Sequence, residues 1–439
     1  MTVSLADRGR DTTAGVVIAV VLVGVNLRAA LTGVGPLLPN IGADTGMSSA
    51  WGGVLTALPL VAFAVLSPLA ARMAQQGAAR LVVPALAVLL VGLLARSLPA
   101  LPMLFVGTVI LSAAIAFANV LLPSIVRGGV PGPRIAAVTA GYATAMTAAA
   151  ATASGIAVPL ADHLPGTWRT ALAVWALPAA VALAVWSPWR RPGLSARRRP
   201  GREESGTVPA RIPRARQRPG ASARRRPGAD ETGQARARIP WRSGLAWQVS
   251  LFFGLQSLGF YATIAWLPSV LRDNGIGARE AGLYLFGFQV LGLLALNAVP
   301  LLPRALAAPR VLAAAASLLN VASLLLLAVV PGLAPLAVVG IGIGAGICLV
   351  LAMSFQSERA ADAAGAAALA GMAQSVGYLV AAAGPVLLGL LHAATGGWAP
   401  ALVVLALLTA AQATVGYGAG RERTVALGPP GTPRPGHRR

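Results

Sequence analysis

Apolar runs of about twenty residues recur from one end of the chain to the other, and this feature limits the possible folds most. At about 1.5 Å of rise per residue, a helix of that length crosses a hydrocarbon core of roughly 30 Å. Strands of a membrane barrel alternate polar and apolar residues, whereas these runs are apolar on every side. Because the mean hydropathy is +0.72 and only 11% of residues are charged, we predict an all-α polytopic membrane protein.

Twelve such runs predict twelve transmembrane helices. The first run follows Arg8 and Arg10, but it is too long for a signal peptide and lacks a small-residue cleavage site, so we expect a retained helix. Gly33, Gly35 and Pro36 favour a bend in this helix. The predicted spans cover residues 14–39, 51–70, 80–97, 101–126, 135–160, 169–188, 244–269, 280–302, 310–330, 333–355, 364–391 and 397–418.

The formal charge of +22 is concentrated in two segments. Residues 190–242 hold sixteen Arg against four acidic residues, and the segment 419–439 is also basic. Most of the other Arg residues lie in even-numbered connections, which predicts a plasma-membrane protein with both termini in the cytoplasm. Tryptophans are then expected at both interfaces, with Trp51, Trp168, Trp266 and Trp398 at the outer one and Trp186, Trp189, Trp241 and Trp247 at the inner one.

An internal repeat relates the two ends of the chain, because the first six predicted spans align with the last six. An even number of spans separates the copies, so the six-helix halves are parallel and have the same orientation. The aligned pairs include Asp44 with Asp273, Gly46 with Gly275 and Trp168 with Trp398. We predict an N-terminal half (1–189), an Arg/Pro-rich linker (190–242), a C-terminal half (243–418) and a basic tail (419–439).

The linker carries a second repeat, since SARRRPG begins at residues 195 and 222, and ARIP at 210 and 237. A duplicated segment rich in Pro, Gly and Arg has no core to bury, so we expect it to be disordered and cytoplasmic. It serves either to fix the topology or to bind anionic lipid headgroups of the bilayer. Nucleic-acid binding is not expected, because no aromatic side chains for stacking separate the arginines.

Four blocks of sequence point to a known family. They are NLRAALTGVGPLLP from Asn26, NVLLPSIVR from Asn119, GLQSLGFYATIAWLP from Gly254 and GMAQSVGYLVAAAGP from Gly371. Together they resemble the cyanate/nitroimidazole (CynX/NimT) family of major facilitator transporters. The resemblance implies the major facilitator fold, a solute cavity lined by the first, fourth, seventh and tenth helices, and a monomer. One departure is the connection LAARMAQQGAARL, which lacks the acidic residue usual in this superfamily.

Arg28 is the strongest candidate for a functional residue, because it lies fourteen residues into the first predicted span. A charge near the bilayer interior costs at least about 2.5–3.5 kcal/mol, so it should face a cavity or a partner. No acidic residue lies deep in a span, and the repeat-related position is the neutral Ser257. Arg28 is therefore predicted to bind an anionic or electron-rich solute group. The alternative is a structural role, in which helix carbonyls and Asn26 satisfy the guanidinium.

Asn26, two residues before Arg28, is a further candidate for binding the solute. The others are polar and aromatic residues spaced one turn apart on later spans. The seventh span carries Gln256, Phe260 and Tyr261, which suit a small planar solute, and the eleventh carries Gln374 and Tyr378. Ordinary packing between helices is the alternative for each of them. Weaker candidates are Asn119, Thr144 and His392.

Motifs for chemistry are absent from the sequence. The stretch GIGIGAG (340–346) lies inside an apolar span with no preceding strand, so close helix packing is expected there, and Cys348 beside it is expected in the core. With no phosphate loop, metal-ligand cluster or activated nucleophile, we expect neither an enzyme nor a cofactor or metal.

The predicted function is secondary transport by alternating access. The expected solute is small and either anionic or planar and nitrogen-containing, such as cyanate or a nitroimidazole. The alternatives are an exporter of hydrophobic drugs and a membrane sensor or scaffold acting through the Arg-rich linker.

Overall fold

The computed structural model describes residues 5–74, 78–187, 240–302, 308–360, 363–421 and 423–425. In these segments twelve helices are long and apolar enough to cross a membrane, which confirms the predicted number of spans. The helices are α1 (Leu5–Thr32), α2 (Val34–Thr45), α3 (Ser49–Ala74), α4 (Ala78–Ala95), α5 (Leu101–Gly129), α6 (Ile135–His163), α7 (Thr167–Ala173), α8 (Ala176–Trp186), α10 (Gly244–Asp273), α11 (Ala278–Ala298), α12 (Pro309–Val329), α13 (Ala334–Glu358), α14 (Ala363–Thr395) and α15 (Ala399–Ala419).

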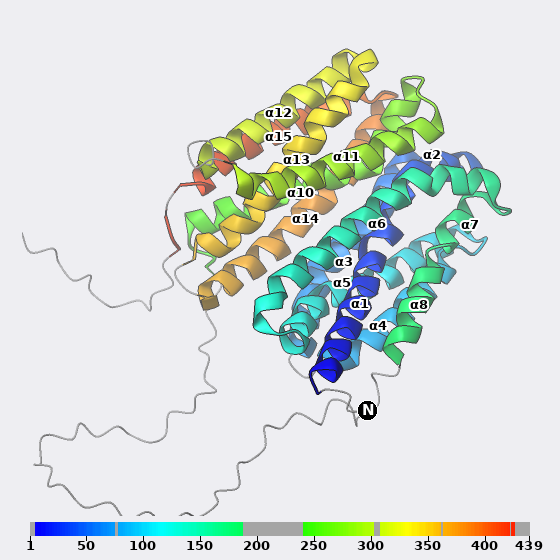
Figure 1. Cartoon of the computed structure of the whole chain (residues 1–439). Helices are drawn as coiled ribbons and strands as arrows, with labels where there is room; N and C mark the ends of the chain where they lie inside the picture. The colour runs from blue at the N-terminus through cyan, green and yellow to red at the C-terminus, as the bar shows by residue number, and fades with distance from the viewer. Residues whose placement is uncertain are drawn as a thin grey trace, which may run out of the picture.

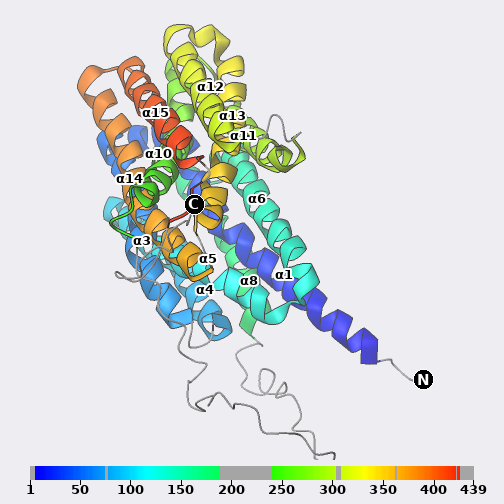
Figure 2. The same ribbon diagram turned by 90° about the vertical axis from the view of Figure 1, so that its left-hand side faces the viewer.

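The helices form two bundles, one from α1 to α8 and the other from α10 to α15 (Figure 1). Figure 2 shows the bundles meeting where α14 runs beside α3, and α11 likewise contacts α6. A third contact joins α2 to α10. Residues 188–239 and 426–439, which include most of the predicted linker and tail, lie outside the described segments. The solute cavity can therefore be sought where the two bundles meet.

The internal repeat is visible as the same hydrogen bond in each bundle. Trp168 Nε1 donates to Asp44 Oδ2 over 3.0 Å, and Trp398 Nε1 donates to Asp273 Oδ2 over 2.7 Å. These are two of the residue pairs aligned in the sequence. Both bonds lie at the end of the molecule that carries the α2–α3 and α10–α11 turns. We call this end the predicted outer end, after the charge bias of the connections.

Arg169 adds an ion pair to the bond in the N-terminal bundle, with 2.7 Å between its guanidinium and Asp44 Oδ2. The hydrogen bonds from Arg169 and then Trp168 lower the pKa of the Asp44 carboxyl below its usual value. Asp44 is therefore ionised at neutral pH and holds the start of α7 against the end of α2.

The tryptophans correct one expectation, because most of those described do not form interfacial belts. Trp168, Trp186, Trp266 and Trp398 are buried, with the indole N–H of each bonded to a carboxylate or a backbone carbonyl. Buried indoles need such acceptors, which here are carboxylates at the ends of α2 and α10 and backbone carbonyls inside α1 and α14. Trp51, Trp241 and Trp247 are exposed as belt residues would be, and Trp189 lies outside the described segments.

Two of the spans are broken near their middle. The first span changes from α1 to α2 at Gly33, which confirms the predicted bend, and the sixth changes from α7 to α8 at residues 174–175, which was not predicted. Pro36 and Pro178 lie in the first turn of α2 and α8. A proline lacks the N–H that a continuous helix needs but is tolerated in a first turn. The break in the first span adjoins the site described below, whose lining includes Thr32 and Val34.

The glycine-rich stretch 340–346 packs closely against neighbouring helices, as predicted. A Cβ at Gly342 would meet the backbone of Phe288, and one at Gly346 would meet the backbone of Gly292. Both neighbours belong to α11, so the absent side chains let α11 and α13 approach closely. Cys348, in the same helix, is fully buried, as expected for a core residue.

Replacing Gly346 with alanine is expected to destabilise the C-terminal bundle, because the new methyl group would displace backbone atoms of α11. Overpacking of this kind costs about 1–3 kcal/mol, which should lower the thermal unfolding midpoint in detergent. Gly287→Ala in α11 is the matched control, since a Cβ there would meet nothing within 4 Å. An unchanged midpoint for Gly346→Ala would contradict the close approach of α11 and α13.

Candidate solute site

A cavity lies where the N-terminal bundle meets α10, with about 570 Å³ of empty space, some of it open to the surroundings. Most of its wall is apolar, and none of the described residues that line it is acidic. Such a cavity, with a few polar groups in an apolar wall, is typical of small-molecule sites. Its lining residues are Arg28, Leu31, Thr32, Val34, Gly35, Leu55, Thr56, Pro59, Leu60, Arg96, Thr108, Tyr261, Ile264 and Ala265.

Arg28 lies in this cavity, in the last turns of α1 before the break at Gly33. Its Cζ atom is 5.8 Å from the ring centroids of both Phe260 and Tyr261 on α10. Within the described part of the chain, its guanidinium makes no hydrogen bond or ion pair. A guanidinium beside two aromatic rings retains all its N–H donors for another ligand.

Asn26 does not satisfy Arg28, although it precedes it by two residues. The Asn26 side chain is buried, and its Nδ2 donates to the carbonyls of Leu22 at 2.8 Å and Pro178 at 3.2 Å. It therefore connects α1 to α8 and is not part of the cavity lining. The structural alternative for Arg28, in which Asn26 is its partner, has no support in this arrangement.

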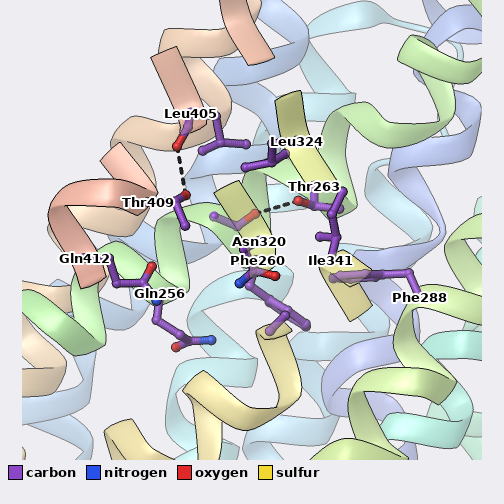
Figure 3. A pocket seen from close by; sticks show the side chains of 12 residues that line it. Gln256, Phe260, Thr263, Phe288, Asn320, Leu324, Ile341, Leu405, Thr409 and Gln412 are labelled. Atoms are coloured by element: carbon purple, nitrogen blue, oxygen red, sulfur yellow. Dashed lines mark hydrogen bonds between the residues drawn. The ribbon is translucent and has the colours of Figure 1, made fainter. Parts of the chain in front are cut away.

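Gln256 and Phe260 line a second cavity, inside the C-terminal bundle (Figure 3). Its polar side chains come from α10, α12 and α15 and are all buried: Gln256, Thr263, Asn320, Thr409 and Gln412. Phe260 belongs to this lining, while its ring also faces Arg28. The ring thus lies between the two cavities, and Gln256 lies on the side away from Arg28.

The family of the chain follows from comparison with known proteins, since residues 17–382 match the model of the Major Facilitator Superfamily. The chain belongs to this superfamily. It is 35% identical over 428 residues, covering 97% of this chain and 100% of the relative, to the 2-nitroimidazole transporter of Escherichia coli (strain K12). The predicted membership of the cyanate/nitroimidazole family is therefore confirmed.

Two further comparisons agree. The cyanate transport protein CynX of Escherichia coli (strain K12) is 28% identical over 397 residues, covering 87% of this chain and 91% of the relative. Among solved structures, an inward-facing, unoccupied bacterial homologue of the human lysosomal transporter Spinster matches with a TM-score of 0.74. That match covers 94% of this chain and 97% of the other at 15% identity, so it shows the fold alone. This major facilitator is thus a multi-pass membrane transporter.

Tyr378 of the transporter lies between its two halves. Its ring packs edge to face against Phe63 of α3 and Phe253 of α10, with centroids 5.6 and 5.5 Å apart. Gln374, one turn earlier on α14, is exposed, as are Asn119 and Thr144 in the N-terminal bundle. None of these four residues lines either cavity, so their predicted contacts with solute stay predictions.

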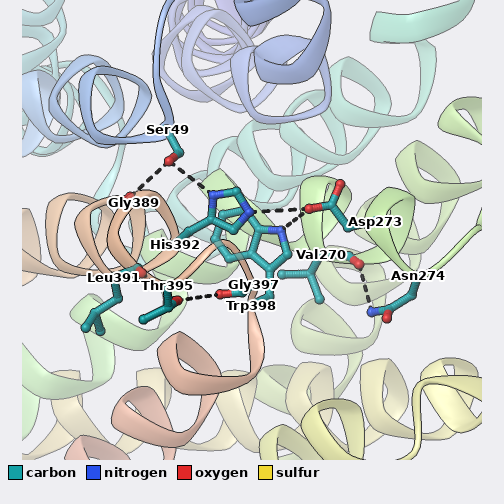
Figure 4. Close-up of polar contacts among 10 residues, drawn as sticks. All are labelled: Ser49, Val270, Asp273, Asn274, Gly389, Leu391, His392, Thr395, Gly397 and Trp398. Atoms are coloured by element: carbon teal, nitrogen blue, oxygen red, sulfur yellow. Dashed lines mark hydrogen bonds and ion pairs between the residues drawn. The ribbon is translucent and has the colours of Figure 1, made fainter.

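His392 lies at the predicted outer end of the transporter, outside both cavities (Figure 4). Its Nδ1 is 3.1 Å from Ser49 Oγ, its Nε2 is 3.4 Å from Asp273 Oδ2, and its ring stacks on Trp398 at 4.0 Å. Ser49 Oγ also donates to the carbonyl of Gly389 over 3.0 Å. These contacts join α3 of one half to α10 and α14 of the other, so His392 is placed to close this end.

Arg96 is a residue of the cavity that sequence reasoning missed. It follows the last residue of α4, is fully buried, and lines the same cavity as Arg28. Its position just before Ser97 and Pro99 is typical of a surface loop. One signal was present, because Arg96 lies at the outer end of the predicted span 80–97, where the charge bias that set the predicted topology disfavours arginine.

Proposed function

We propose that this transporter moves a small anionic or planar nitrogen-containing solute, such as cyanate or a nitroimidazole, by alternating access between its two halves. The observation that carries the proposal is Arg28, whose guanidinium lies in a cavity between the halves and has no acidic partner among the described residues. An unpaired charge inside a membrane protein is costly, and an electron-rich solute would offset that cost.

The arrangement around Arg28 also suits the shape of such a solute. A guanidinium is a planar fork of N–H donors that matches carboxylate-like groups. The rings of Phe260 and Tyr261 offer flat apolar faces on which a planar solute can lie. The names of the 2-nitroimidazole and cyanate relatives support the same class of solute.

An exporter of hydrophobic compounds is the second candidate function, because most side chains of the cavity wall are apolar. The two candidates differ in the effect of charge. If the solute is anionic or electron-rich, Arg28 contributes to binding, whereas a hydrophobic cargo needs only the apolar wall.

The test is uptake and counterflow by the purified protein in proteoliposomes. We expect saturable flux of cyanate or 2-nitroimidazole, competition by small planar anions, and no competition by lipophilic cations. Saturable transport of lipophilic compounds alone, with no effect of anions, would favour the exporter and contradict the proposal.

A variant lacking residues 195–240 is the control for the sensor or scaffold alternative. The described residues that line the two cavities belong to the two helical halves, so transport should continue at the wild-type rate. If the deletion abolished flux while the protein still folded, the Arg-rich linker would have a role beyond connecting the halves.

A further inference from the structure

Arg96 makes two hydrogen bonds that join separate spans of the N-terminal bundle. One terminal nitrogen donates to the carbonyl of Ala30 over 2.6 Å, and the other donates to the carbonyl of Leu172 over 3.4 Å. The side chain is fully buried, and no described atom accepts a hydrogen bond from its Nε. A charged group so placed needs a structural or functional reason.

Both acceptors lie where a helix ends inside the bundle. Ala30 is in the last turn of α1, before the break at Gly33, and Leu172 is in the last turn of α7, before the break at 174–175. The last four carbonyls of a helix have no partner within it. Away from water each such carbonyl is costly, and a cation is favoured at a helix C-terminus. Arg96 therefore supplies the donors that the two broken helices lack.

The C-terminal bundle provides an internal comparison. There α10 and α15, the counterparts of the first and sixth spans, run without a break from Gly244 to Asp273 and from Ala399 to Ala419. The position that corresponds to Arg96 in the repeat is Leu326. A buried arginine thus occurs in the half whose helices are broken and is replaced by leucine in the half whose helices are continuous.

We propose that Arg96 is a positioning residue, which holds the broken first span against the broken sixth span and so fixes Arg28 in the solute cavity. Arg28 precedes Ala30 by two residues, so the bond from Arg96 restrains the turn that carries Arg28. Asn26, one turn before Ala30, donates to the carbonyl of Pro178 and so also ties this part of α1 to the sixth span. The effect on transport rests on the proposed role of Arg28, whereas the contact between the spans does not.

A structural readout tests the contact without any solute. In Arg96→Gln, amide hydrogen exchange measured by mass spectrometry should speed up at least about tenfold in peptides covering residues 28–36 and 170–178. Peptides of the unbroken α10 should be unchanged. Equal exchange in the variant and the wild type would overturn the proposal, whatever the solute.

Transport in a variant that lacks Pro36 and Pro178, which we call the proline-free background, tests the mechanism. Pro36→Ala with Pro178→Ala should let both helices continue, so that the backbone N–H groups four residues further along replace Arg96 as donors to the carbonyls of Ala30 and Leu172. Arg96→Gln should raise the half-saturation concentration for anion counterflow by about tenfold in the wild type, with the maximal rate less affected. In the proline-free background the same change should have less than about a twofold effect.

The outcomes separate the possible failures. An equal loss in both backgrounds would overturn the proposal, because Arg96 would then act on the solute and not through the breaks. If Arg96→Gln alone fails to fold, the proline-free background should restore folding, and no restoration would also overturn it. If Arg28→Gln leaves anion flux intact, the proposed function fails, while the exchange experiment still decides whether Arg96 holds the two spans together.

Discussion

Replacing Arg28 with glutamine is expected to raise the half-saturation concentration of the transported anion by about 10- to 150-fold, at equal protein in proteoliposomes. A hydrogen bond to a charged group contributes about 1.5–3 kcal/mol, and each 1.4 kcal/mol is roughly a factor of ten. Glutamine keeps polar contacts of similar length but removes the charge and the forked donors. Uptake measured over a range of solute concentrations gives the shift directly.

Ser257→Ala is the matched control, because Ser257 occupies the position that corresponds to Arg28 in the other half. Its hydroxyl donates to Gln256 at 3.2 Å and does not line the cavity of Arg28, so its loss should leave anion affinity unchanged. Arg28→Lys keeps the charge without the planar fork and should fall between wild type and Arg28→Gln. Unchanged affinity in Arg28→Gln would remove Arg28 from the site.

The positions of the helices could be predicted because the bilayer demands long apolar runs, whatever the tertiary contacts. The tenth helix of the numbering, α10, covers 244–273, against a predicted span of 244–269. The aligned Asp and Trp residues of the repeat also follow from sequence, since a carboxylate and an indole N–H can satisfy each other in each half. These features are set by local composition and by duplication.

The break in the sixth span could not be predicted from its proline alone. Pro59, Pro84 and Pro123 lie inside helices α3, α4 and α5, which continue through them. Pro178 lacks the N–H that would bond the carbonyl of Val174. At the same break the carbonyl of Leu172 accepts a hydrogen bond from Arg96, which is far away in sequence, so the break depends on tertiary structure. The same dependence on tertiary structure hid the role of Arg96 itself.

The candidate site was predicted in part. Gln256 and Phe260 share one face of α10, as their spacing requires, but that face looks into the C-terminal bundle. Tyr261, the next residue, lies in the cavity of Arg28. The face of α10 that carries Gln256 and the face that carries Tyr261 are both apolar with a few polar groups. The sequence therefore does not indicate which of them contacts the N-terminal half. The packing of α10 against α2 decides this point.

Replacing Gly389 with valine is expected to stop transport, with flux lowered by more than about tenfold, by preventing closure of the predicted outer end. At this position a Cβ would meet the backbone of Ser49 and the ring of Trp266 (Figure 4 shows the neighbouring contacts). Gly53→Val should act in the same way, because a Cβ there would meet the backbone of Pro385. Clashes of this kind with backbone force the helices apart.

The clashes with the backbone of Ser49 and of Pro385 lie between the halves, so the closed state becomes unfavourable while each half should still fold. The contact with the Trp266 ring lies within the C-terminal half. Because the single Cys348 is buried, a cysteine introduced at Ala265 in the cavity wall can be labelled selectively with an impermeant maleimide. Labelling from outside should be faster in Gly389→Val than in the wild type. Gly371→Val, in the same helix but with nothing within 4 Å of its Cβ, should change neither flux nor labelling. Wild-type flux in Gly389→Val would mean that α3 and α14 need not approach this closely during transport, and the contacts of His392 would then have no part in the cycle.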